Sequence, residues 1–135
     1  MDNRSALLEC ALNLFAARGY DAVGVQEICE AVGITKPTLY HYFGSKRGLL
    51  EAVLTSSFNR LKEELQEVVI YKGDLPLTLH QVAMAYFSFA RNHSVFYRLQ
   101  LGLWFAPLES EAFQCVSDLN RFQFEMIEKI FLDAV

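Results

Sequence analysis

The chain has 135 residues, of which 53% are hydrophobic and 21% charged, with three prolines and seven glycines. This balance is that of an ordered globular protein and excludes a disordered chain. Its three cysteines include no C-x-x-C pair, so they favour neither a disulfide framework nor a zinc site and are typical of a reducing cytoplasm. Because no apolar run approaches the length of a membrane span, we expect a soluble, cytoplasmic protein.

The net charge of −4 is unevenly distributed along the chain. Residues 1–50 hold five basic and five acidic residues, whereas residues 51–135 hold seven and eleven. Between Ile34 and Leu50 there are three basic residues, one histidine and no acid. A surface that faces DNA phosphates needs such a local bias, so the overall acidity does not exclude a nucleic-acid partner.

The first fifty residues are predicted to form three short helices, over 3–18, 25–32 and 36–43. A glycine follows each of them, at Gly19, Gly33 and Gly44. Thr35 is a good N-cap for the third helix, and Pro37 is tolerated because the first helical turn has no donors to lose. Two short helices joined by a tight glycine turn are typical of a helix-turn-helix, with the small Cys29 and the apolar Ile28, Ile34 and Leu39 inside the angle.

The remaining chain is also predicted to be helical, which gives an all-α fold. A fourth helix, capped by Ser45 and extending to about Val69, is long enough to connect two modules. Residues 71–76 contain Gly and Pro and indicate a domain boundary. Beyond it we expect helices over 77–93, over 94–106 and from Ser110 onward. The last has a narrow polar stripe, so we expect it to be buried on more than one side. It has no stop signal, so we also expect the second domain to be truncated at its C-terminus.

One segment resembles the signature of TetR-family helix-turn-helix regulators. It runs from Gly33 to Leu50 and reads GITKPTLYHYFGSKRGLL. The resemblance covers residues 3–55, whereas residues 76–135 agree only in being helical. One departure is Gly24, where the family usually has a threonine or serine that caps the second helix. The resemblance implies a DNA-binding domain over 1–48, a connecting helix over 45–70, and an effector-binding and dimerisation domain over 74–135.

The resemblance also implies a DNA-binding site. Lys36 and Thr38 would reach base edges, and Gln26 is suited to adenine. The other members would hold the sugar-phosphate backbone or shape the helix start. The predicted set is Gln26, Thr35, Lys36, Pro37, Thr38, Tyr40, His41, Tyr42 and Lys46, with Arg4 and Arg47 as outer phosphate contacts. The alternatives are core packing for Tyr40 and Phe43, and ordinary solvated side chains for His41, Lys46 and Arg47.

The aromatic stretch from residue 86 to 105 supports an effector pocket, because TetR relatives typically bind a small inducer in the second domain. The alternative is a dense hydrophobic core, since aromatic residues at helical spacing are first a packing signal. The candidate ligand-binding residues are Tyr86, Phe89, Arg91, Tyr97, Leu101, Trp104 and Phe105. A matching ligand is small and largely apolar or aromatic.

The leading functional interpretation is therefore a dimeric repressor that leaves operator DNA when the ligand binds. We expect no catalytic residue, cofactor, metal or membrane partner. A helical enzyme is the first alternative, but the sequence has no nucleophile elbow, phosphate-binding glycine loop, metal spacing or close acid pair. The second is an interaction module whose helix-turn-helix serves packing only, and the basic stretch from Ile34 to Leu50 argues against it.

Overall fold

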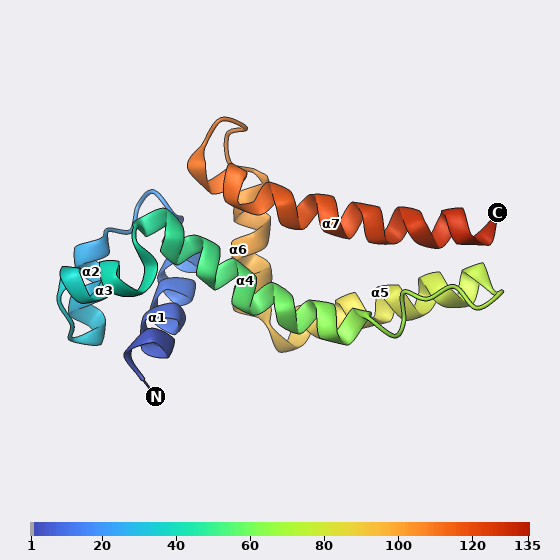
Figure 1. Cartoon of the computed structure of the whole chain (residues 1–135), viewed down its shortest axis with the longest axis horizontal. Coiled ribbons are helices and arrows are strands. Elements are labelled where there is room, and N and C mark those ends of the chain that lie inside the picture. The colour runs from blue at the N-terminus through green and yellow to red at the C-terminus, as the bar shows by residue number, and fades with distance from the viewer. Residues whose placement is uncertain (1) are drawn as a thin grey trace.

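The structure is a computed structural model that describes residues 2–135, and within that range it contains helices and no strand. The predicted all-α fold is therefore confirmed. Figure 1 shows the first three helices at one end of the molecule, the fourth, fifth and seventh extending towards the other end, and the sixth running across them. The seven helices are α1 (Asn3–Arg18), α2 (Val25–Val32), α3 (Lys36–Phe43), α4 (Lys46–Leu65), α5 (Leu75–Asn92), α6 (Ser94–Trp104) and α7 (Glu111–Ala134).

The first three helices have the predicted bounds because their ends are set locally. The carboxylate of Asp2 accepts a hydrogen bond from Ser5 N at 2.7 Å and so caps α1. Gly33 ends α2 in the left-handed conformation, with φ 84° and ψ 35°, which favours glycine because it has no Cβ. Such signals are local in sequence, so they can be recognised without tertiary information.

The fourth helix is shorter than predicted. The Ser45 hydroxyl accepts from Gly48 N at 2.9 Å and caps its start as expected, but α4 ends at Leu65 rather than near Val69. The backbone N–H groups of Val68 and Val69 both donate to the Leu65 carbonyl, at 3.0 and 3.1 Å. This tightened turn ends the helix while both valines remain half-buried, so the apolar spacing continues past the helix end.

Two boundaries in the second half also differ from the prediction. Helix α5 begins at Leu75, before the expected residue 77, because Asp74 caps it and Pro76 occupies its first turn. Helix α6 ends at Trp104 rather than at residue 106. The start of α7 agrees with the prediction, since the Ser110 hydroxyl accepts from Phe113 N at 3.1 Å.

The buried apolar side chains form one core that crosses the whole molecule. Helix α1 packs against α2, α4 and α6, and α4 also packs against α3, α5 and α7. The core begins at Phe15 and Leu39 in the first three helices and follows α4 through Leu54 and Leu61. It ends at Ile130 on α7. The helix-turn-helix is thus continuous with the helical body behind it.

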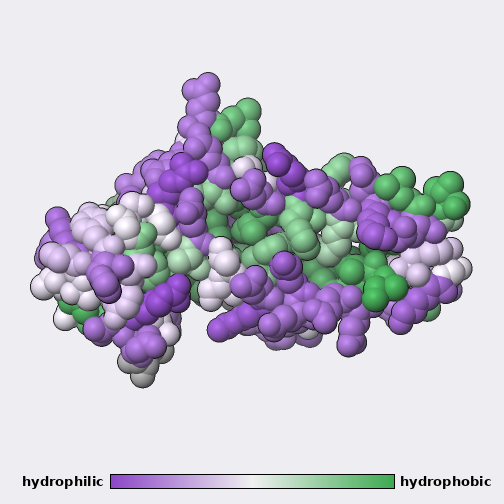
Figure 2. Space-filling model, viewed as in Figure 1, coloured by the Kyte–Doolittle hydropathy of each residue, from purple (hydrophilic) through white to green (hydrophobic). Residues whose placement is uncertain are grey.

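The expectation that α7 is buried on more than one side is wrong. Its side chains Phe122, Phe124, Phe131 and Leu132 are all exposed, because α4, α5 and α6 cover only one side of the helix. Figure 2 shows apolar surface at the C-terminal end of α7 and over the loop between α6 and α7. Among residues 2–135, no helix combines the length and apolar character needed to cross a bilayer.

Candidate functional site

The turn between α2 and α3 fixes the direction of α3. The N–H groups of Gly33 and Ile34 both donate to the Cys29 carbonyl, at 2.8 and 3.0 Å. Cys29 and Ile28 on α2 and Leu39 on α3 are almost completely buried. The packing role predicted for Cys29 agrees with this burial, since a small side chain there lets the two helices approach closely. With Leu39 held inside, the opposite side of α3 faces solvent.

The exposed side of α3 carries most of the predicted DNA-binding residues. Thr35, Lys36, Pro37 and His41 are exposed, and Tyr40 and Tyr42 are 43% and 40% exposed. Among the described residues, the Lys36 ammonium takes part in no ion pair. The predicted core-packing alternative for Tyr40 is therefore not what the structure shows. These side chains form an open polar and aromatic surface at the end of the molecule where Figure 1 places α3.

Three of the predicted residues, Thr35, Thr38 and Gln26, have polar side-chain partners within the protein. Thr38 is half-buried, and its Oγ1 lies 3.1 Å from Thr35 Oγ1, which links the cap residue to the first turn. Gln26 is exposed on α2, where its amide donates to the Glu30 carboxylate at 2.9 Å. A contact of Gln26 with a base therefore requires that this bond be exchanged.

Lys46 begins α4 and lies against a buried aromatic ring. Its ammonium is 4.2 Å from the ring centroid of Tyr20, a distance at which a cation is attracted to the ring face. Tyr20 is 5% exposed, and burial together with the nearby Glu111 carboxylate raises the pKa of its phenol. The half-buried Lys46 is thereby held at the positive end of α4, where an anion is favoured.

The two outer arginines have different surroundings. The Arg4 guanidinium carbon lies 5.4 Å from the Phe43 ring centroid, so this exposed arginine is next to the end of α3. Arg47 donates through Nε to Glu51 at 3.0 Å and through Nη1 to Gln114 on α7 at 3.1 Å. Arg47 is therefore engaged within the protein, unlike the solvated side chain that the alternative interpretation expected.

Gly48 was not singled out for the site by the sequence pattern, although it belongs to the signature segment. A Cβ added at Gly48 would lie 2.0 Å from the Phe43 carbonyl oxygen. Only glycine therefore lets the first turn of α4 pass this close to the last residue of α3. This contact sets the position of Lys46 relative to α3.

A small apolar pocket opens between α5, α6 and α7. Its volume is about 370 Å³, and it is lined by Tyr86, Trp104, Asn120, Gln123, Phe124 and Ile127. The Tyr86 hydroxyl donates to Gln123 Oε1 at 2.9 Å, and the Trp104 indole N–H donates to the Asn120 side chain. Burial raises the pKa of Tyr86 to about 12. The pocket thus combines aromatic walls with two paired amides.

The structure brings together two of the seven predicted ligand-binding residues, Tyr86 and Trp104, at this pocket. Phe89 is buried in the core, with its ring centroid 4.4 Å from that of His93, and Leu101 is half-buried. The others are exposed and do not line the pocket: Arg91, Tyr97 and Phe105, the last at 86% exposure.

The α7 side of the pocket was missed by the sequence reasoning. Asn120 and Gln123 lie outside the polar stripe of α7, which contains Asp118, Arg121 and Glu125. Uncharged amides on the otherwise apolar side of a helix are a signal of buried polar pairing, since buried polar groups need partners. That signal marks both residues.

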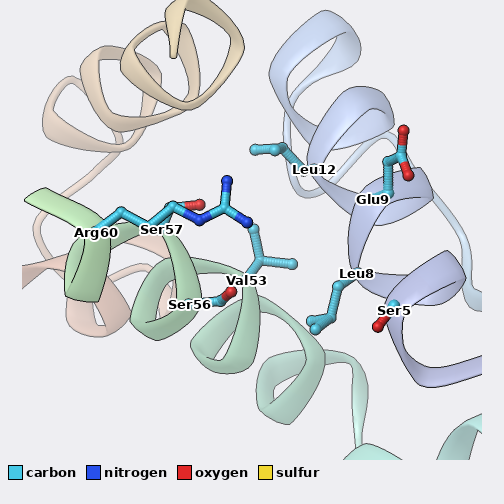
Figure 3. Close-up of a pocket in the computed structure, with 8 residues that line it drawn as sticks. All are labelled: Ser5, Leu8, Glu9, Leu12, Val53, Ser56, Ser57 and Arg60. Carbon is cyan, nitrogen blue, oxygen red and sulfur yellow. The ribbon is translucent and has the colours of Figure 1, made fainter. Parts of the chain in front are cut away.

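A second groove lies between α1 and α4 and differs in chemistry. Its volume is about 410 Å³, with Ser5, Leu8, Glu9 and Leu12 on one side and Val53, Ser56, Ser57 and Arg60 on the other. In Figure 3 the Arg60 guanidinium extends from α4 into the groove towards α1. This groove has charged and hydroxyl groups among its lining, so its character is less apolar than that of the α5–α7 pocket.

Comparison with known proteins places these features in a family. Residues 7–53 match the sequence profile described as bacterial regulatory proteins, tetR family. The HTH-type transcriptional activator FasR of Mycolicibacterium smegmatis is 35% identical over 98 residues, which are 73% of this chain and 45% of that protein. The HTH-type transcriptional repressor KstR2 of Rhodococcus jostii is 35% identical over 92 residues, covering 67% of this chain and 45% of that protein.

The whole length of this chain superimposes on part of a solved structure. The crystal structure of the TetR family transcriptional regulator PfmR from Thermus thermophilus superimposes with a TM-score of 0.74 and 25% identity. The similarity covers 100% of this chain and 72% of that chain. In contrast, the matches with FasR and KstR2 span less than half the length of those two relatives.

Proposed function

The chain belongs to the TetR family of bacterial regulatory proteins, and on this premise we propose that it is a transcriptional regulator that binds operator DNA through α3. The observation that carries the proposal is the exposed face of α3, which lies in an acid-free stretch of sequence and presents an unpaired Lys36 among the described residues. A helix of this kind, braced by a second helix across a tight turn, fits the major groove.

The proposal gives the residues different roles. Lys36 and Thr38, in the first turn of α3, read base edges, lysine through guanine acceptors and threonine through the thymine methyl. Tyr40, His41 and Tyr42 contact sugar and phosphate, and so fix the register on the duplex. Thr35 and Pro37 shape the start of α3, while Gln26 and Lys46 add flanking contacts. Such DNA lies in the bacterial cytoplasm, where the protein would act.

We also propose that the pocket at Tyr86 and Trp104 binds the effector. Its volume of about 370 Å³ is within the usual range for small-molecule sites. Aromatic walls favour an apolar or aromatic body, and the amides of Asn120 and Gln123 offer hydrogen bonds to a single polar group. A ligand of this description must replace the bonds that these amides make to Trp104 and Tyr86.

The proposed outcome is repression by a homodimer that leaves DNA when the effector binds. One relative is named a repressor and another an activator, so the direction of control needs measurement. A dimer matches the symmetry of operators whose half-sites lie about 34 Å apart. Exposed apolar side chains such as Phe87 and Leu132 are consistent with association. Sedimentation equilibrium should give twice the chain mass, and a monomer at every concentration would contradict this part.

The DNA assignment is tested by salt-dependent mobility shifts on promoter fragments. The double variant Lys36→Ala, Lys46→Ala should lose most of its affinity and show a weaker dependence on salt, because about one counterion is released per phosphate contact. The matched control is Lys72→Ala, Lys129→Ala, at exposed lysines away from α3. DNA binding that is the same in all three proteins would exclude the proposed function.

A further inference from the structure

The first turns of α7 contact the DNA-binding end of the molecule directly. Gln114 accepts a hydrogen bond from Arg47 Nη1 at 3.1 Å, across 67 positions of sequence. The same arginine donates to Glu51 at 3.0 Å, and the Cys115 thiol lies 4.0 Å from that carboxylate. One arginine in the first turn of α4 is thus held between its own helix and α7.

A second contact lies beside the first. Glu111, the first residue of α7, is close enough to Tyr20 to contribute to the raised pKa of its phenol, after the larger effect of burial. Tyr20 in turn supports the Lys46 ammonium at 4.2 Å. The two basic residues that begin α4 are thus both connected to α7. Arg47 is hydrogen-bonded to Gln114, and Lys46 lies over the ring of Tyr20, which is near Glu111.

The same helix lines the apolar pocket further along. Helix α7 is continuous from Glu111 to Ala134, and its residues Asn120, Gln123, Phe124 and Ile127 form one side of the pocket. Gln123 lies nine positions after Gln114, which is a distance of about 14 Å along a helix. Helices move as stiff units over such lengths, so a displacement at the pocket is transmitted to the Gln114 end.

We propose that α7 is a direct link between the pocket and the DNA-binding domain, and that Arg47 is the positioning residue that receives its movement through Gln114. The sequence pattern indicated α4 as the connecting helix, and this inference adds a second, parallel connection. A ligand that parts Tyr86 and Trp104 from α7 shifts that helix and changes the contact at Arg47. The start of α4, and with it α3, then turns relative to the body. The inference rests on the proposed function.

The test uses the single tryptophan of the chain, Trp104, which lines the pocket and donates to Asn120 on α7. Coupling between two sites is reciprocal, so DNA binding must alter the pocket if the pocket alters DNA binding. Trp104 emission is therefore recorded while a duplex selected by the protein from a random library is added to saturation. Wild-type protein should show a change in emission that saturates with the DNA.

Two variants locate the link. Gln114→Ala removes the acceptor for Arg47 and should abolish at least half of the emission change, while DNA affinity changes by less than about threefold because Gln114 is not placed in the DNA surface. Arg47→Lys keeps the charge but not the guanidinium geometry that reaches Glu51 and Gln114 together, so it should lose a similar share of the emission change. The control is Gln81→Ala, an exposed glutamine on α5, which should retain the full change.

The outcomes separate the inference from the function on which it rests. A full emission change in Gln114→Ala, or no change in the wild-type protein at saturating DNA, overturns the link through α7. Failure of the wild-type protein to select any duplex overturns the proposed function instead. Thermal unfolding of each variant, followed by circular dichroism, shows whether the helical fold is intact during these comparisons.

Discussion

Gly48 shows how one atom constrains the site. Because a Cβ there would lie 2.0 Å from the Phe43 carbonyl oxygen, Gly48→Ala must push α4 away from α3. We expect a loss of about 1–3 kcal/mol in the free energy of unfolding, as for other overpacked positions, and a matching loss of DNA affinity. Urea denaturation measures the first effect and mobility shifts the second.

The chain offers a glycine control of opposite sign. Gly102 lies inside α6, with nothing within 4 Å of an added Cβ. Gly102→Ala should therefore stabilise the protein by about 0.5–1 kcal/mol, since alanine favours helix interiors. Equal effects of the two substitutions would show that the contact between Gly48 and Phe43 does not constrain the fold.

Tyr86 gives the protein a specific alkaline response. Burial raises the pKa of its phenol from 10.0 to about 12, so the folded state retains a proton that the unfolded state loses. The contribution to stability is fully present below pH 10 and falls as the pH rises towards about 12. Tyr86→Phe should remove this part of the decline in stability between pH 10 and about 12. Identical pH profiles for wild type and Tyr86→Phe would contradict the burial of this phenol.

At the scale of the helix, α2 begins at a glycine N-cap and therefore has no side-chain capping bond. Gly24 is in an extended conformation, with φ −95° and ψ 152°, makes no side-chain capping bond, and leaves open space for a Cβ. Gly24→Ser should stabilise the protein by about 0.5–1 kcal/mol, partly by capping and partly by restricting the unfolded chain. Its hydroxyl should also tighten DNA binding if this position faces phosphate.

Gly24→Ala separates the two causes, because alanine restricts the unfolded chain but has no oxygen to cap the helix. The serine variant should have the highest urea midpoint of the three proteins. The alanine variant should exceed the wild type only if restricting the unfolded chain stabilises the protein by more than alanine, a poorer N-cap than glycine, destabilises it. A serine variant no more stable than the alanine variant would show that the cap does not form.

The helices differ in how far their sequences predict them. Helices α1 to α3 end at glycines, and these local signals locate the ends without knowledge of packing. The end of α4 was placed too late because Val68 keeps the apolar spacing in the turn that follows the helix. For α7, the pattern shows that most of the helix surface is apolar. It does not show which apolar side chains the other helices cover, and Phe124 and Phe131 are exposed.

In the candidate site, too, local sequence patterns predict exposure and burial within a helix but not contacts between distant segments. The exposure of Lys36 and the burial of Leu39 follow from helical spacing within α3, which is local information. The contacts of Lys46 with Tyr20 and of Arg47 with Gln114 join distant segments, so no local pattern contains them. For the pocket, Phe89 and Phe105 have the right chemistry, but only the crossing of α5, α6 and α7 decides which aromatic residues face it.

Across the whole molecule, one core joins the helix-turn-helix to the helical body. A destabilising substitution at one end of the molecule should therefore also lower the stability of the other end. Leu39→Ala, at a residue with 0% exposure, should cost about 2–5 kcal/mol of unfolding free energy. Urea transitions followed by Trp104 emission and by circular dichroism should move together, because both report the same cooperative unit. A Trp104 transition with the same urea midpoint in Leu39→Ala as in the wild type would show that the two domains unfold independently.

The central claim is that the first turn of α3 reads operator sequence, and selection of duplexes from a random library tests it most directly. Wild-type protein should enrich one sequence motif. Lys36→Ala should lose about 1–3 kcal/mol of affinity for that motif and relax the preference at a single base position, whereas Lys72→Ala should select the wild-type motif unchanged. An unaltered motif and affinity for Lys36→Ala would contradict the claim.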